Sequence, residues 1–295
     1  MSPVKMALLS DRGVVGVAGE DAEKLLQGVI ANDMALLARQ AAMHAALLTP
    51  QGKILFEFFV VKAPGGFLLE TGSDQAAGLV KRLGMYKLRA KVTITDASAE
   101  YRVIAVWSAS PRSSGEMSGS ISYADPRLPA LGLRVLAETR SAAGIAAATN
   151  GVEVPEQGYH ADRIALGVPE AGKDYVLGDT FPHEANMDVL NGVSFTKGCF
   201  VGQEVVSRMH HRATTRKRIV IVEAQAPLQP GSEILAGAAS IGRVGSVAGN
   251  RALALLRRDR AAEAEEKGEP LTAAGIALVI RLPDYLRSAA AAGAP

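Results

Sequence analysis

The sequence has a single cysteine, Cys199, among its 295 residues. One thiol excludes an intrachain disulfide framework, and it excludes a zinc or iron–sulfur site built from several cysteines of the same chain. No apolar run approaches the roughly 18–20 residues that a membrane-spanning helix needs. The sequence therefore predicts no transmembrane segment and no metal site of its own.

The chain also has almost no excess of one charge over the other. The 32 basic and 30 acidic residues leave a net charge of +2, which does not favour a nucleic-acid-binding protein. Residues 1–6 have neither the apolar core of a signal peptide nor the arginine-rich character of a transit peptide, so the cytoplasm is the expected compartment. The hydrophobic content of 48% is that of a globular chain able to form one large domain or two ordinary ones.

The stretch around the cysteine is the most informative part of the chain. Lys197 precedes Cys199 by two residues, and Gln203 onward predicts a short amphipathic helix. A nearby cation and a helix N-terminus both favour the thiolate form of a cysteine. The flanking glycines, Gly198 and Gly202, predict a sharply turned backbone that presents the side chain.

A lone cysteine is more often a small buried apolar residue than a working group. Packing alone, however, does not require Lys-Gly before the cysteine and Phe-x-Gly-Gln-Glu after it. The context therefore favours a working thiol at Cys199, although Glu204 opposes the thiolate if its carboxylate points at the sulfur.

The run Lys197-Gly198-Cys199-Phe200-x-Gly202-Gln203-Glu204, followed by Arg208, resembles the signature of the YgfZ family of folate-binding-fold proteins. These are relatives of the glycine-cleavage aminomethyltransferase, or T-protein. The resemblance implies a role in the assembly or repair of iron–sulfur proteins, with client or assembly proteins as partners. It also implies that Cys199 is the working thiol, that Lys197 tunes it, and that the remaining motif residues support the loop, namely Gly198, Gly202, Gln203, Glu204 and Arg208.

The resemblance covers most of the chain and implies an α+β fold of mixed sheets and helices, with a folate-binding-fold domain over residues 1–215. A division of that domain into two subdomains stays open, and the serine- and glycine-rich residues 108–122 predict a flexible loop. Evenly spaced short strands predict a β-barrel over residues 216–288. The alanine-rich residues 289–295 predict a frayed tail.

Hydrophobic periodicity predicts the individual elements. Strands are expected in the first domain at 14–17, 45–48, 54–61, 66–70, 91–95, 101–107 and 131–136, and in the barrel at 219–222, 239–247, 252–256 and 276–280. Helices are expected from residue 21 to about 30, from 73 to 89, and within the charged stretch 260–269.

The resemblance further implies a tetrahydrofolate-type ligand. The residues carried over for it are Asn32, Asp33, Glu57, Arg163 and Asn186. Glu57 is the one charge in an apolar strand, and it needs a partner if its side chain faces a core, because an unpaired buried carboxylate is unfavourable.

Two departures bear on this ligand. Phe56 and Glu57 stand where the aminomethyltransferases carry two adjacent aspartates, and Ala165 stands where relatives carry a glutamate that reads the pteridine ring. Losing one charge-assisted hydrogen-bonded pair weakens binding by about 1.5–3 kcal/mol. A tetrahydrofolate-dependent one-carbon transferase that uses Glu57, and a folate-binding adaptor without turnover, are therefore the alternatives to the maturation role, and enzymatic activity stays open.

Two further stretches could be mistaken for sites. His183-Glu184 lacks a second histidine at helical spacing, so it indicates a polar loop rather than a metal site. Residues 208–218 hold seven basic or histidine side chains, which predict either a solvated linker or a landing site for a folate glutamate tail or an acidic partner. No aromatic residues alternate with these charges, so base stacking on RNA is not favoured.

Overall fold

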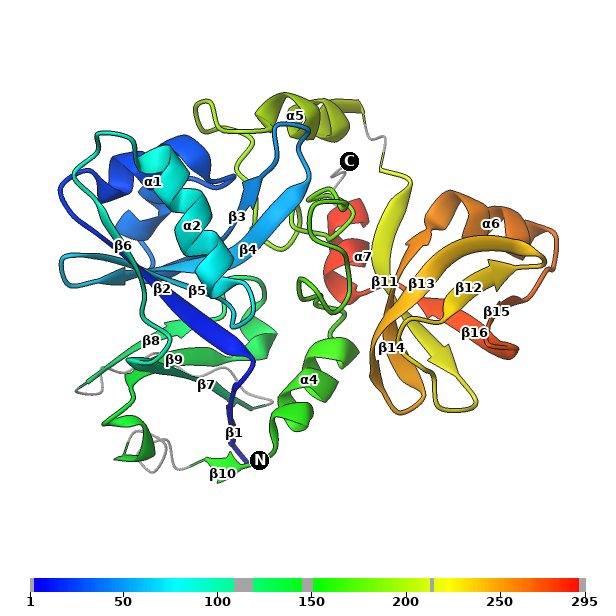
Figure 1. Ribbon diagram of the computed structural model, residues 1–295. Coiled ribbons are helices and arrows are strands. Elements are labelled where there is room, and N and C mark those ends of the chain that lie inside the picture. The colour runs from blue at the N-terminus through cyan, green and yellow to red at the C-terminus, as the bar shows by residue number, and fades with distance from the viewer. Residues whose placement is uncertain (1–2, 109–118, 145–150, 213–214, 292–295) are drawn as a thin grey trace. The chain divides into compact units, whose positions relative to one another are not determined.

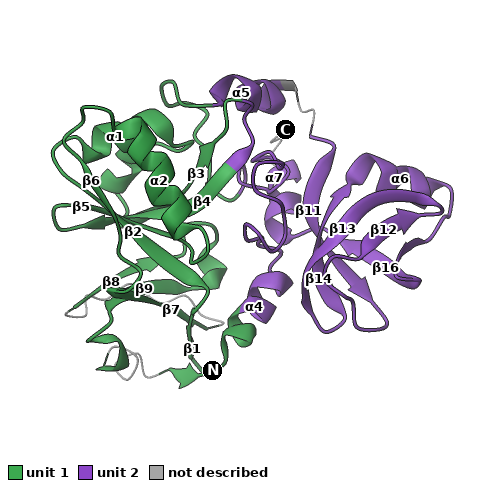
Figure 2. Ribbon diagram, viewed as in Figure 1, with its two compact units in different colours: residues 1–50, 55–159, 190–201 green, residues 51–54, 160–189, 202–295 purple. Residues whose placement is uncertain are grey.

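The computed structural model describes residues 3–108, 119–144, 151–212 and 215–291. The described chain forms two compact units. Unit 1 comprises residues 1–50, 55–159 and 190–201, and unit 2 comprises residues 51–54, 160–189 and 202–295 (Figure 2). The chain passes from one unit to the other several times, so neither unit is one continuous segment.

Unit 1 contains two five-stranded sheets. The strands of the first, in spatial order, are β10 (Val152–Glu153), β1 (Lys5–Leu8), β7 (Tyr101–Trp107), β9 (Leu133–Glu138) and β8 (Ser120–Ala124). Those of the second are β3 (Ala42–Leu48), β4 (Ile54–Ala63), β5 (Gly66–Gly72), β2 (Arg12–Ala18) and β6 (Thr93–Asp96). Most neighbouring strands of these sheets pair antiparallel, whereas β1 and β10 pair in parallel.

Two helices, α1 (Ala22–Val29) and α2 (Ala76–Lys87), cover one face of the second sheet (Figure 1). Their apolar stripes, which include Leu26 and Leu79, pack on strand residues such as Val60 and form the main core of unit 1. Unit 1 also contains two 3-10 helices, η1 (Met34–Ala38) and η2 (Pro129–Leu131).

The opposite face of the second sheet packs on the first sheet through a charged interior. The Phe59 ring of β4 lies 5.9, 5.0 and 5.3 Å from the guanidinium groups of Arg12, Arg127 and Arg134. These buried cations are paired, since Arg134 Nη1 lies 2.7 Å from Glu70 Oε1 and Arg127 Nη2 lies 2.8 Å from an Asp125 oxygen. Burial opposes the charge on Asp125, but Arg127 and Arg134 outweigh it and lower its pKa to about 2.

Unit 2 contains a closed barrel. Its strands, in order, are β11 (Lys217–Ala224), β14 (Arg251–Arg257), β13 (Ala239–Ala248), β12 (Glu233–Ala236), β15 (Leu271–Ala273) and β16 (Ile276–Arg281), and β16 pairs with β11 to close it. The barrel core consists of apolar residues such as Val220, Ile234 and Leu256. The helices α5 (Gln203–Arg212), α6 (Arg258–Glu266) and α7 (Asp284–Ala291) also belong to this unit, and α4 (Glu156–Ala165) bridges the boundary at residue 160 in the chain.

The predicted α+β class and C-terminal barrel are confirmed. The predicted loop 108–122 is too long, because Ser120–Ser122 pair with β9 as part of β8, while residues 109–118 lie outside the described part. The predicted frayed tail at 289–295 is partly wrong, because α7 continues to Ala291. Alanine has the highest helix propensity of all residues, so an alanine-rich segment extends the helix that precedes it.

Within the described part of the chain, none of the helices combines the length and apolar character needed to cross a bilayer.

Candidate functional site

Cys199 lies in unit 1, on the segment 190–201, and its side chain is exposed. The residues on either side of it differ sharply in burial, since Gly198 is exposed whereas Lys197 and Phe200 are buried. The thiol therefore projects from a short loop that is fastened at both ends.

Lys197 fastens the loop to the end of helix α1. Its Nζ donates hydrogen bonds to the backbone oxygens of Gln27, Ile30 and Asn32 at 2.7, 2.8 and 2.9 Å. The last carbonyl groups of a helix have no partner within the helix and carry a partial negative charge, so they attract an ammonium group. All three ammonium protons are used, and the Phe200 ring lies 5.3 Å from the same nitrogen.

Burial lowers the pKa of Lys197 to about 8, and the carboxylate of Asp33 opposes this effect. The contacts give Lys197 a role in holding the loop. That it also tunes Cys199 stays a prediction.

Asn32 connects this anchor to the β3–β4 hairpin. Its Nδ2 donates to the carbonyl oxygens of His44 and Asn191, both at 2.7 Å, and its Oδ1 accepts from the Asp33 N–H at 2.8 Å. Asp33 in turn caps η1 by accepting from the Ala35 N–H at 3.0 Å. The buried Asn32 amide thus joins the end of α1, strand β3 and the segment that leads to Cys199.

His44 and Glu57 form a hydrogen-bonded pair on neighbouring strands. His44 Nδ1 lies 2.8 Å from the Leu190 carbonyl oxygen, and Nε2 lies 2.8 Å from Glu57 Oε1. A carbonyl oxygen only accepts, so Nδ1 is the donor toward Leu190, and Nε2 faces the Glu57 carboxyl group. The His44 ring thus links the segment that leads to Cys199 with strand β4.

Glu57 thus has the partner that its place in an apolar strand required, and its side chain is 11% exposed. Sequence reasoning missed His44. The available signal was the presence of two titratable residues, one in each arm of the predicted hairpin, within otherwise apolar strands. In unit 1, Lys197, Asn32, Asp33 and Glu57 are thus brought into one hydrogen-bonded network through His44.

The later motif residues belong to unit 2. Gly202 adopts a positive φ of 81°, which favours glycine, immediately before α5 begins at Gln203. Glu204 and Arg208 are exposed and lie one turn apart on α5. Among the described residues, the side chains of Gln203, Glu204 and Arg208 form no hydrogen bond or ion pair. Their support of the Cys199 loop stays a prediction.

Arg163, also in unit 2, is fully buried near the end of α4. It donates to Asp174 Oδ2 and the Val168 carbonyl, both at 2.7 Å, and to the Ser246 hydroxyl at 2.8 Å. Its donors stabilise the fold of unit 2 internally. Ala165, the last residue of the same helix, adds no polar group.

Asn186 is buried in the 181–188 loop and has a left-handed backbone with φ of 60°. Its Nδ2 donates to the Ile219 carbonyl at 2.9 Å and to the Tyr285 hydroxyl at 3.0 Å. The loop is also held by Arg218, whose two terminal nitrogens each lie 2.7 Å from an Asp188 oxygen. Arg218 is therefore not part of the exposed basic stretch that the sequence predicted at 208–218.

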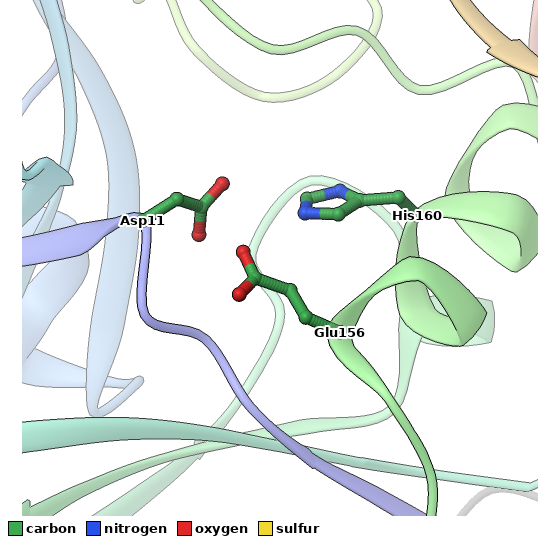
Figure 3. A group of neighbouring side chains, drawn as sticks. All are labelled: Asp11, Glu156 and His160. Atoms are coloured by element: carbon green, nitrogen blue, oxygen red, sulfur yellow. The ribbon is translucent and has the colours of Figure 1, made fainter.

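Figure 3 shows three side chains of types that bind metals, Asp11, Glu156 and His160. Glu156 and His160 lie one turn apart on α4, and Glu156 Oε2 accepts from the backbone and hydroxyl of Ser10 at 3.1 and 2.6 Å. His160 Nε2 lies 3.2 Å from Lys173 Nζ. These polar contacts account for the positions of Glu156 and His160 without an ion.

Four matches with known proteins bear on the family and the fold. Residues 216–288 match the model of the CAF17 C-terminal beta-barrel domain. The human mitochondrial iron–sulfur cluster assembly factor IBA57 is 34% identical over 274 residues, which cover 84% of this chain and 76% of the human protein. This chain belongs to the IBA57 family.

An IBA57 homologue of Mycosarcoma maydis, named as a mitochondrial iron–sulfur cluster assembly factor, is 36% identical over 229 residues. That match covers 73% of this chain and 56% of the fungal protein, so the chain spans little more than half of that relative's length. The crystal structure of glycine cleavage system aminomethyltransferase T from Bartonella henselae aligns over 96% of this chain and 86% of that protein, with a TM-score of 0.78 and 16% identity. The IBA57-family chain thus has a T-protein-like fold, as the resemblance implied.

Proposed function

We propose that this chain assists the assembly or repair of iron–sulfur proteins through the thiol of Cys199. The observation that carries the proposal is an exposed thiol, the only one in the chain, two residues from a buried lysine bonded to three carbonyl oxygens. The names of the IBA57 relatives support it, and the motif around Cys199 supports the finer assignment to the YgfZ family.

The chemistry follows from the thiol. A thiolate is a soft ligand that suits iron–sulfur clusters, which are substrate here. One cysteine supplies one ligand, so the remaining ligands of a cluster come from a client, an assembly protein or a second copy of the chain. The Lys197 anchor keeps the thiol in a defined position, which lowers the entropy lost when a ligand is engaged.

The test is Cys199→Ser, expressed in cells that lack the native copy. Activity of an iron–sulfur client enzyme should fall to the level of the deletion strain, while the abundance and Tm of the variant stay unchanged. Thr196→Ala, an exposed change three residues away, is the matched control and should retain activity. Full client activity with Cys199→Ser would refute the thiol role.

A folate-type ligand is the second candidate, supported by the T-protein-like fold and by Glu57. Of the five residues assigned to this ligand, Asn32, Arg163 and Asn186 are engaged by internal hydrogen bonds. The side chains of these three residues therefore stabilise the fold of their own units and are not available to bind a ligand. Ala165 has no side-chain hydrogen-bond acceptor. Glu57, whose carboxyl group lies 2.8 Å from His44 and whose side chain is 11% exposed, is the side chain best suited to bond a ring nitrogen.

Calorimetric titration with tetrahydrofolate under anaerobic conditions tests this candidate. Wild-type and Cys199→Ser proteins should bind alike, and Glu57→Gln should weaken binding by about 10-fold or more. If the wild type does not bind tetrahydrofolate, the folate candidate is refuted, whereas the proposal for the Cys199 thiol is unaffected. Cytoplasmic location likewise stays a prediction, since the curated relatives named above are mitochondrial.

A further inference from the structure

The turn that follows helix α2 has an unusual backbone at Leu88. Its φ and ψ are 44° and −109°, and the Ala90 N–H donates to the Lys87 carbonyl at 2.8 Å. These values place Leu88 at the first central position of a type II′ turn, which glycine normally occupies. A leucine in this conformation is strained, because its Cβ crowds the backbone.

Packing within unit 1 does not compensate for this strain. The Leu88 side chain is 88% exposed, and Met85, three residues earlier, is 62% exposed. Lys81 lies one turn before Met85 on the same face of α2, and it is exposed as well. The end of α2 thus presents two large apolar side chains to the surface, beside a cation.

A cavity of about 390 Å³ lies between this turn and helix α1. Its lining is mostly apolar and consists of Asp21, Lys24, Leu25, Gly28, Val29 and Ala90. Gly28 leaves it open, because a Cβ at that position would have no atom within 4 Å. The cavity is large enough for one aliphatic or aromatic side chain from another molecule.

The surroundings of the cavity are basic. Residues 81–91 contain five cations and no acid, although the whole chain has a net charge of only +2. Lys91 pairs with Glu20 at 2.8 Å. Within the described part of the chain, the other cations near the cavity form no ion pair or hydrogen bond through their side chains, namely Lys24, Lys81, Arg82, Lys87 and Arg89.

Helix α1 contributes acids as well, and these limit the attraction. Asp21 accepts a hydrogen bond from the Lys91 N–H at 2.8 Å, Glu20 is paired with the Lys91 side chain, and Glu23 is exposed. The cations still outnumber these three carboxylates, so the surface attracts an anionic partner.

We propose that the end of α2, the turn 87–90 and the adjoining cavity form a docking surface for an acidic segment of a partner protein. An apolar side chain of the partner fills the cavity, Leu88 packs against the partner, and the unpaired cations contact its carboxylates. The concave cavity favours a protein over a lipid surface, which has no side chain to place there. No side chain of this surface contributes to the Lys197–Asn32–His44–Glu57 network, so the inference does not depend on the proposed function.

The probe is a short acidic peptide with one central phenylalanine, labelled for fluorescence anisotropy and titrated with the full chain. It should bind, and replacing its phenylalanine by serine should weaken binding. Leu88→Gly should weaken binding about 10-fold, and Lys87→Glu combined with Arg89→Glu should abolish the salt dependence together with most of the affinity. Val176→Ser, at a side chain 66% exposed in unit 2, is the control and should bind as the wild type does.

Leu88→Gly also separates docking from folding. Because glycine relieves the strained turn and little packing is lost, its Tm should equal or exceed that of the wild type. Wild-type affinity in Leu88→Gly, or a peptide that does not bind the wild type, would overturn the proposal. Binding to phosphatidylglycerol vesicles but not to the peptide would overturn it too, because the surface would then recognise lipid.

Discussion

Two loops of this molecule are each held by a buried cation, but the groups that the two cations contact differ in charge. In unit 1, the Cys199 loop is held by an ammonium group, Lys197, on three neutral carbonyl oxygens. In unit 2, the 181–188 loop is held by Arg218, which makes a two-pronged ion pair with Asp188 at 2.7 Å per bond. One cation is buried without a carboxylate in contact, and the other is neutralised by its partner.

The contact that depends on pH, that of Lys197, lies two residues from the Cys199 thiol. Burial brings the pKa of Lys197 down to about 8, near physiological pH. Arg218 instead makes two charge-assisted hydrogen bonds to the two oxygens of one carboxylate. The Cys199 loop is therefore attached by a buried lysine whose pKa lies near physiological pH, and the 181–188 loop by a two-pronged ion pair.

The largest effect is expected from breaking the ion pair. Asp188→Asn leaves the buried Arg218 guanidinium without its counter-charge, and it should lower the free energy of unfolding by about 3–5 kcal/mol. Urea denaturation measures this. The double variant Asp188→Leu with Arg218→Met should recover part of the loss, since neither charge is then buried alone. A loss below about 1 kcal/mol in Asp188→Asn would show that the Arg218–Asp188 pair holds its loop no more strongly than a surface ion pair would.

A second effect sharpens the comparison through pH. Burial lowers the pKa of His183 to about 4, with Arg218 and His210 lowering it further and Asp188 raising it. Between the ordinary value of 6.5 and about 4 the unfolded chain binds more protons, so stability falls as pH falls through this window, by about 3 kcal/mol in all. Thermal unfolding at a series of pH values tests this, and His183→Gln should flatten the curve. An unchanged curve in that variant would assign the pH dependence to other groups.

The smallest effect concerns the anchor of the thiol. Lys197→Met removes three hydrogen bonds and the burial of a charge, so the net loss should be about 1–3 kcal/mol. The alkylation rate of Cys199 should change as the loop loosens. Stability of the wild type should rise between pH 8 and 10.5, where only the unfolded chain keeps the lysine proton, and this rise should vanish in the variant.

A matched control for the anchor is Lys53→Met. Lys53 pairs at the surface with Asp179, and removing such a pair should change stability by less than about 1 kcal/mol. If both lysine variants behave alike, the three carbonyl contacts of Lys197 contribute no more than a surface pair does.

The sequence predicted the helices and strands that are marked by a pattern of neighbouring residues. The periodicity at 21–30 gave α1, the paired apolar runs gave β3 and β4, and the helix after Gly202 was found as α5. The barrel was predicted from strand spacing, but its two shortest strands, β12 and β15, were missed because three or four residues carry little periodic signal.

The polar interior was not predictable by the same means. Arg134 and Glu70 lie 64 positions apart in the chain, and each sits in a strand where a charge normally indicates a solvent-exposed face. Only the packing of one sheet on the other brings them together. The Lys197 contacts are more distant still in the chain, since the carbonyl oxygens that it binds precede it by 165 to 170 residues. A motif identified the lysine but not its partners.

The division of the chain also has a consequence for biosynthesis. Because residues 190–201 complete unit 1, the nascent polypeptide cannot finish that unit until residue 201 has been synthesised. Residues 216–288, in contrast, form a contiguous barrel that can close as soon as it leaves the ribosome. Cys199 therefore emerges only after the hairpin and helix that its loop docks onto have been made. The thiol meets folded partners as soon as it emerges, which shortens the period in which it is exposed on an unfolded chain.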